Sequence, residues 1–186
     1  MTSVRCPWCL STPEYIDYHD KEWGKVVKDD QTLFECIVLE SAQAGLSWIT
    51  ILRKREGYRR LFHQFDPEKV ALMSEQDVER LLEDASIVRH RGKIEATINN
   101  AKIFLKITEE FGSFSDYYWA FSGHKVLANP ITSMADVPAK TELSERIAKD
   151  MKKRGFRFFG ATTCYAFMQA TGMVNDHLLD CIARSE

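Results

Sequence analysis

Two pairs of metal-type ligands lie near opposite ends of the 186-residue sequence. Cys6 and His19 stand near one end, and His177 and Cys181, four positions apart on one face of a helical turn, stand near the other. Two thiolates and two imidazoles form the closed tetrahedral set that structural zinc prefers, with no position left for a catalytic water. The spacing alone leaves a second interpretation open, in which the histidines are hydrogen-bonded and the cysteines are small buried apolar groups.

Cys9 adds a Cys-Pro-Trp-Cys motif to the first of these pairs. A Cys-x-x-Cys pair occurs in half zinc sites and in thiol–disulfide oxidoreductases. A redox motif of the thioredoxin type follows a strand and opens a helix, whereas no strand pattern precedes Cys6, so the oxidoreductase is the weaker interpretation. The odd number of cysteines, 5, argues against a disulfide framework and favours a reduced, cytoplasmic setting.

A cluster of aromatic residues surrounds one acid whose position is unusual. Glu40 follows the apolar run 37–39, and helical spacing turns its side chain toward the core, where a carboxylate needs either partners or a ligand. The neighbouring aromatic residues are Tyr15, Tyr18, Trp23 and Trp48. Plain core packing and hydrogen bonds from the amides of residues 45–48 to Glu40 are the alternatives. As a pocket, the set suits a flat, cationic, hydrogen-bond-donating ligand, such as a base methylated at a ring nitrogen.

Composition and charge limit the classes of protein that the sequence fits. It is 45% hydrophobic and 28% charged, so it can build a core, and no apolar run is long enough to span a membrane or to form a signal peptide. The net charge of −2 argues against an indiscriminate nucleic-acid binder, but not against a local basic face. Basic clusters lie within residues 53–60, 89–93 and 152–157, where ordinary solvated helix faces are the alternative.

Helical periodicity dominates the sequence, and we predict an all-α protein. The pattern predicts a helix that opens at Asp30, with that Asp as its cap, and short helices over 47–58, one of which ends at Gly57. It also predicts a helix with Pro67 in its first turn and a helix that begins with a capping box at Ser74. Further helices are predicted over 90–111, 144–154 and 162–172. Only 126–128 and 156–159 suit strands, and 123–140 is predicted to be a long connection. We expect one domain of two merged lobes, residues 30–112 and residues 1–29 with 113–186.

Several motifs in order make the sequence resemble the 3-methyladenine DNA glycosylase I family. They are Tyr-His-Asp-Lys-Glu-Trp-Gly at 18–24, Leu-Glu-Ser-Ala-Gln-Ala-Gly-Leu-Ser-Trp at 39–48, Ile-Val-Arg-His-Arg-Gly-Lys-Ile at 87–94, Lys-Arg-Gly-Phe-Arg-Phe at 153–158 and Asn-Asp-His at 175–177. The resemblance runs from about Cys6 to Cys181. It implies a helix-hairpin-helix superfamily fold and a monofunctional enzyme that hydrolyses the N-glycosidic bond of 3-methyladenine in DNA, leaving an abasic site.

The resemblance also implies roles for individual residues. A structural zinc ion would be bound by Cys6, His19, His177 and Cys181, with Cys9 outside the family pattern. Glu40 and Tyr18 would be the catalytic residues, and the base would lie among Trp48, Trp23, Tyr15 and Trp8. Leu46 would fill the gap left by the flipped nucleotide, and Gln43 would touch the bases beside it.

The implied hairpin spans residues 85–89, where backbone amides would hold a phosphate near Ser86 while Arg89, Arg91 and Lys93 add positive charge. Relatives usually carry a small turn former such as Gly at position 86. Because Ser tolerates a positive φ less well, we expect a hairpin that is either slightly strained or differently shaped.

The expected partners are double-stranded DNA with alkylated adenine and free 3-methyladenine as product, with no membrane and a monomeric protein. A binding module for DNA or nucleobases that has lost its chemistry is the non-catalytic alternative. Because the methylated base is already cationic, it leaves readily and needs little general-acid help.

Overall fold

The computed structural model describes residues 4–185, and helices make up most of this part of the chain. They are α1 Pro13–Lys21, α2 Asp30–Ala42, α3 Trp48–Leu61, α4 Pro67–Ala71, α5 Glu75–Leu82, α6 Arg91–Phe111, α7 Phe114–Ala120, α8 Glu142–Arg154 and α9 Ala161–Ala170. Short 3-10 turns lie at Pro7–Cys9, His63–Phe65 and Met134–Asp136. The strands β1 Leu127–Ala128 and β2 Val174–Asn175 form one parallel pair. The predicted helical class is confirmed.

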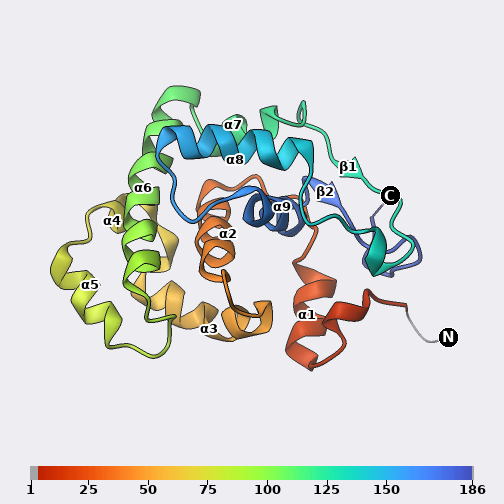
Figure 1. Ribbon diagram of the computed structural model, residues 1–186, viewed down its shortest axis with the longest axis horizontal. Helices are drawn as coiled ribbons and strands as arrows, with labels where there is room; N and C mark the ends of the chain where they lie inside the picture. The colour runs from red at the N-terminus through yellow and green to blue at the C-terminus, as the bar shows by residue number, and fades with distance from the viewer. Residues whose placement is uncertain (1–3, 186) are drawn as a thin grey trace.

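Helix α2 lies at the centre of the molecule, in contact with α6, α7 and α9 (Figure 1). Its apolar residues recur at helical spacing, and Leu33, Phe34 and Ile37 are fully buried. The helices α3, α4 and α5 lie beside the lower half of α6 in Figure 1, whereas α1 and the two described chain ends lie on the opposite side. This arrangement leaves the C-terminal end of α2, which carries Glu40, between α1 and the α5–α6 connection.

The caps of α2 and α7 correct the prediction for Asp30. The carboxylate of Asp29, not of Asp30, accepts the amide hydrogen of Thr32 and caps α2. The Asp30 carboxylate instead accepts from the amides of Phe114 and Ser115 at the start of α7. Of these two neighbouring aspartates, Asp29 therefore caps its own helix and Asp30 caps a helix far along the chain. The capping box at Ser74 is confirmed.

Helix α3 is one continuous helix, so the prediction that Gly57 ends a helix was wrong. Gly57 is needed for close packing: a Cβ atom there would lie 2.3 Å from the backbone oxygen of Ser86. Three more contacts join the two segments, since Lys54 donates to the Ala85 oxygen, Arg60 donates to the Ser86 hydroxyl, and the Val88 amide donates to the Tyr58 hydroxyl. The helix α3 therefore braces the α5–α6 loop.

Of the two predicted strands, the one at 126–128 is confirmed for Leu127–Ala128 only, which form β1 and pair with a strand absent from the prediction. Residues 156–159 form a loop between α8 and α9, because the polar ends of Asn99 and Asn100 on α6 take the hydrogen bonds that a neighbouring strand would supply. Over residues 4–185, no helix has both the length and the apolar character required to cross a membrane.

Candidate active site and metal centre

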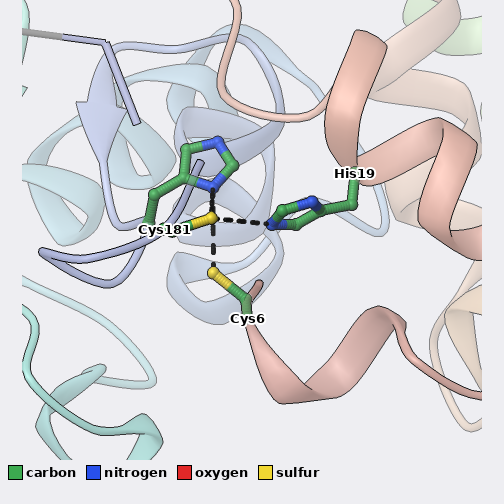
Figure 2. A group of neighbouring side chains, drawn as sticks. Cys6, His19 and Cys181 are labelled. Carbon is green, nitrogen blue, oxygen red and sulfur yellow. Dashed lines mark hydrogen bonds between the residues drawn. The ribbon is translucent and has the colours of Figure 1, made fainter. Parts of the chain in front are cut away.

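Cys6, His19, His177 and Cys181 meet in a buried cluster that joins the two ends of the chain. Their ligand atoms all lie within 4.8 Å of one another. Figure 2 shows the Cys181 thiol between the ring of His19 and the thiol of Cys6. The Cys181 Sγ atom lies 3.5 Å from His19 Nε2 and 3.6 Å from His177 Nδ1, and Cys6 Sγ lies 3.7 Å from the same His177 nitrogen.

These distances fit a tetrahedral zinc ion. Bonds of about 2.3 Å to sulfur and about 2.0–2.1 Å to nitrogen, at tetrahedral angles, place a sulfur and a nitrogen about 3.6 Å apart. Three of the four separations between sulfur and nitrogen, 3.5, 3.6 and 3.7 Å, agree with this value. The donor set also lacks a carboxylate and is closed to solvent, which is typical of structural sites.

The second ring nitrogen of each histidine has a partner that fixes its orientation. His19 Nδ1 lies 2.8 Å from the Asp20 carboxylate, and His177 Nε2 lies 3.1 Å from the Trp23 carbonyl oxygen. Such partners hold the hydrogen on that nitrogen and leave the other nitrogen free to bind a metal. Burial lowers the pKa of His177 to about 4, which keeps the ring neutral. Burial raises the pKa of the Cys6 thiol to about 12.

Cys9 lies outside this cluster although it is fully buried. Its thiol donates to the backbone oxygen of Cys6 at 3.2 Å, so it supports the turn that carries the first ligand. Residues 7–9 form a single 3-10 turn, with no strand before it among the described residues.

A cavity of about 220 Å³ opens next to the cluster of Cys6, His19, His177 and Cys181. Aromatic rings form most of its wall: Trp8 meets Tyr15 edge-on at 5.0 Å and Trp23 at 4.9 Å, while Tyr18 meets Trp48 at 5.6 Å. The ring of Trp23 also lies 4.7 Å from that of His177, so one aromatic side chain touches both the cavity and the four-residue cluster. The sequence prediction named each of these cavity residues.

Glu40 lies in the wall of this cavity with only 6% of its surface exposed. Within residues 4–185 no group donates a hydrogen bond to its carboxylate, so the alternative of amide donors from residues 45–48 does not hold. Burial raises the pKa of Glu40 to about 8, and no neighbouring cation counteracts this effect. A second cavity of about 250 Å³ borders Glu40, Tyr18 and Trp48 from behind. Glu40 is therefore an unsatisfied hydrogen-bond acceptor that faces open space.

The pocket also contains residues that sequence reasoning did not name. They are Met134, Val137, Ala166, Gln169 and Asp176. The Gln169 amide donates to the Asp176 carboxylate at 3.0 Å, and Asn129 and Tyr165 donate to the same carboxylate. Asp176 stood in the Asn-Asp-His motif beside a metal ligand. Its neighbours Asn129 and Gln169, however, are brought to it only by the β1–β2 pairing and by α9, so no local signal marked them.

Leu46 lies on a tight turn between Gln43 and Trp48, two residues that line the pocket. The turn is closed by the Leu46 amide, which donates to the Gln43 oxygen at 2.7 Å, and Gly45 takes a φ of 79°. Leu46 remains 40% exposed although it is apolar, and Gln43 borders the cavity. The Lys93 ammonium donates to the backbone oxygens of Ala42 and Ala44, so this residue ties α6 to the turn. These two hydrogen bonds engage the Lys93 ammonium, which was predicted to face a phosphate.

The α5–α6 loop, residues 83–90, departs from the predicted hairpin. Ser86 has no positive φ, so the expected strain is absent; its hydroxyl donates to Asp84 and accepts from Arg60. The amides of residues 86–88 are taken by internal partners. Arg91 is paired with the nearby acids Glu75, Glu79 and Glu95. Among the described residues, the side chain of Arg89 forms no ion pair, and the amides of residues 89, 91 and 92 find no acceptor.

Comparison with known proteins places this geometry in a family. The profile of the methyladenine glycosylase family matches residues 8–185. The DNA-3-methyladenine glycosylase of Haemophilus influenzae is 52% identical over 179 residues, 96% of this chain and 97% of that protein. DNA-3-methyladenine glycosylase 1 of Escherichia coli is 52% identical over 177 residues, 95% of each chain.

Solved structures agree with these sequence matches. A crystal structure of 3-methyladenine DNA glycosylase I superposes with a TM-score of 0.94 at 50% identity, covering 98% of this chain and all of that one (100%). The Staphylococcus aureus enzyme, solved to explain its recognition of 3-methyladenine, superposes with a TM-score of 0.95 at 39% identity, covering 97% of this chain and 96% of that one. The chain therefore belongs to the methyladenine glycosylase family.

Proposed function

We propose that the protein is a DNA-3-methyladenine glycosylase, which hydrolyses the N-glycosidic bond of 3-methyladenine in alkylated DNA. A water oxygen bonds to the sugar carbon, the bond to the cationic base breaks with its electron pair going to the base, and one water proton passes to solvent. The products are the neutral free base and an abasic site. The observation that carries this proposal is Glu40, a buried acceptor without a partner in the wall of an aromatic cavity. Family membership and relatives named for this activity support it.

Glu40 and the aromatic rings would act mainly by binding. The Glu40 carboxylate accepts hydrogen bonds from the exocyclic amine of the methylated base, while the faces of Trp48 and Tyr18 attract its positive charge. An unmodified purine lacks that charge and is a poor leaving group. Because the damaged base already carries the charge, a site that favours it when extruded requires little proton donation. The exposed apolar Leu46 would fill the gap that the extruded nucleotide leaves in the duplex.

We propose that the four-ligand cluster binds zinc in a structural role. The ion would hold the segment that carries Trp8, Tyr15, Tyr18 and Trp23 against the rest of the molecule, and so fix one wall of the base pocket. The support is the agreement of the distances with tetrahedral zinc and the oriented second nitrogens of both histidines. When bound, zinc would supply structural stability, with no open position for chemistry.

We also propose that α5, the 83–90 loop and α6 form the helix-hairpin-helix element that contacts the DNA backbone. The support is that, within residues 4–185, the amides at the start of α6 have no acceptor and the Arg89 side chain has no ion-pair partner, while the helix dipole favours a phosphate there. We expect the phosphate near residues 89–92, because the amides of residues 86–88 are already engaged.

The test is base release from N-methylated duplex DNA, followed by chromatography of the free bases. Wild-type protein should release 3-methyladenine in many turnovers, whereas the Glu40→Gln variant should release it far more slowly. Stoichiometric binding of methylated DNA without turnover by folded, zinc-loaded protein would refute the glycosylase and favour the binding module. Unchanged release by the variant would refute the role of Glu40 alone.

A further inference from the structure

The loop between α8 and α9, residues 155–160, is fastened to α6 beside the hairpin. Asn100, which is 2% exposed, holds Arg157 by two backbone bonds: the Arg157 amide donates to Asn100 Oδ1 at 2.9 Å, and Asn100 Nδ2 donates to the Arg157 oxygen at 2.9 Å. Asn99 donates to the Gly155 oxygen at 2.8 Å. In Figure 1 this loop runs from α8 down along α6 before it enters α9. Its position is therefore fixed by buried side chains.

Phe158 lies on this loop with an unfavourable backbone conformation and an exposed side chain. Its φ of 55° lies in the left-handed region, which bulky side chains rarely adopt, and 43% of its surface is exposed. The ring meets His90 of the hairpin edge-on at 5.9 Å and lies against Gly92. Core packing does not explain a strained backbone that holds an aromatic ring in solvent. Such strain is found mostly at binding and catalytic sites.

Arg157 precedes this ring and is fully available to an anion. Its side chain is exposed, and in the part of the chain that the structure describes it forms no ion pair. Arg89, in the neighbouring hairpin loop, is exposed and unpaired in the same way. By contrast, Arg154, three residues before Arg157, is paired with Glu110 and Asp150. Each of the two neighbouring loops thus carries one arginine without an ion-pair partner among the described residues: Arg157 in the 155–160 loop and Arg89 in the 83–90 loop.

The loop also lies next to the turn that carries Leu46. Phe158 lines a small cavity together with Ala42 and Lys93. Lys93 in turn donates to the backbone oxygen of Ala44, two residues before Leu46. Phe158 therefore lies between the hairpin and the Leu46 turn, and these three segments form one continuous face.

We propose that Arg157 and Phe158 form a further DNA-contacting element, which binds duplex DNA between the hairpin and the Leu46 turn. Arg157 binds a backbone phosphate, and the Phe158 ring packs against the sugar and base edges beside the extruded nucleotide. This inference rests on the proposed function, since it assumes that the partner is duplex DNA. It goes further by assigning the DNA-facing role of a loop outside the hairpin and the base pocket.

The Arg157→Ala variant tests the phosphate contact. Binding to a short duplex with a stable abasic-site analogue is measured between about 50 and 200 mM salt. Loss of one phosphate contact lowers the slope of log affinity against log salt by about 0.9, so the ratio of wild-type to variant affinity changes about 3.5-fold over this range. The Lys125→Ala variant removes another exposed cation, which precedes β1 and has no ion-pair partner within residues 4–185, and it should leave the slope unchanged. An Arg157→Ala slope equal to that of wild type overturns the proposal.

The Phe158→Gly variant tests the ring, because Gly accepts the positive φ. We expect at least about fivefold weaker duplex binding, in line with the effect of losing an aromatic contact with DNA, while binding of free 3-methyladenine stays unchanged. Phe158→Ala keeps the strain and should bind duplex as weakly as Phe158→Gly but melt at a lower temperature. Wild-type duplex affinity in both variants, or an equal loss of duplex and free-base binding, contradicts the assignment.

Failure of this inference is distinguishable from failure of the proposed function. If wild-type protein releases 3-methyladenine and the variants bind duplex normally, only the role of Arg157 and Phe158 is refuted. If wild-type protein neither releases the base nor binds the duplex, the proposed function itself fails, and this element fails with it.

Discussion

Replacing Glu40 by Gln is expected to stabilise the folded protein, and to do so more strongly as the pH rises. Burial raises the pKa of Glu40 from 4.5 to about 8, so the folded state holds the proton more tightly than the unfolded state. The stability linked to this proton is fully present below about pH 4.5 and is lost as the pH rises toward about 8. Gln is neutral throughout and does not undergo this loss.

The magnitude follows from the size of the shift. Each unit of pKa corresponds to about 1.4 kcal/mol. With the ordinary value of 4.5 and a folded value of about 8, the wild-type protein loses about 1 kcal/mol by pH 5 and about 4 kcal/mol by pH 8, relative to strongly acidic solution. The free energy of unfolding of Glu40→Gln should therefore gain about 3 kcal/mol on that of wild type between these two pH values.

Urea denaturation at pH 5, 7 and 8 measures this difference. Glu83→Gln is the matched control, because Glu83 is exposed and makes no side-chain hydrogen bond within residues 4–185. Its difference from wild type should not change with pH. If the Glu40→Gln difference is equally independent of pH, the carboxylate is not buried without a partner, and the argument for the base pocket loses its main support.

The same substitution should weaken binding of 3-methyladenine. Loss of a charge-assisted hydrogen bond costs about 1.5–3 kcal/mol, which is about 10- to 150-fold in affinity. Because the ionised form of Glu40 binds a cationic base best, excision at sub-saturating DNA should rise from pH 6 to pH 8 in wild type, and this rise should vanish in the variant. A more stable but less active variant would mark Glu40 as a residue kept for function at the expense of stability.

Other variants test the proposed zinc cluster, the contact between α3 and the α5–α6 loop, and the Leu46 turn. Cys181→Ser should lose bound zinc, measured by metal analysis, and about 4 kcal/mol of stability in zinc at about 1,000 times its Kd, whereas Cys9→Ser should keep the metal. Gly57→Ala should lower the melting temperature and weaken duplex binding, because the new Cβ would displace the Ser86 backbone; normal duplex binding would show that the loop yields freely. Leu46→Ala should leave unfolding unchanged, since the side chain is 40% exposed, yet slow excision from duplex in a turnover assay. Equal excision would remove Leu46 from the DNA contact.

Sequence reasoning predicted the elements that depend on local chemistry. The long helix α6 between His90 and Gly112, the first-turn Pro67 and the Ser74 capping box are each specified by a few neighbouring residues. The burial of Glu40 followed from helical spacing in the same way. A resemblance along nearly the whole chain added the set of residues that the fold brings together around the pocket.

The features that were missed depend on tertiary contacts. Gly57 is typical of a helix end, but its role is the approach of a distant backbone. Asp30 is typical of a cap and does cap, but at α7, far along the chain. The charge of Arg91 suggested a phosphate contact, whereas its ion-pair partners come from α5 and the next turn of α6. The ion-pair partner of a long side chain depends on how the helices pack, and this packing cannot be predicted from the periodicity of the sequence.

The four-ligand cluster makes assembly of this protein depend on both ends of the chain. Cys6 and His177 are 171 residues apart, so during synthesis the cluster is incomplete until every helix from α1 to α9 has been made. The segment with Trp8 and Tyr18 carries Cys6 and His19, so it becomes anchored to the rest of the molecule only when the cluster is complete. If the cluster binds zinc as proposed, the base pocket would be the last part of the molecule to acquire its wall, and a chain interrupted before residue 177 would lack a completed site for the base.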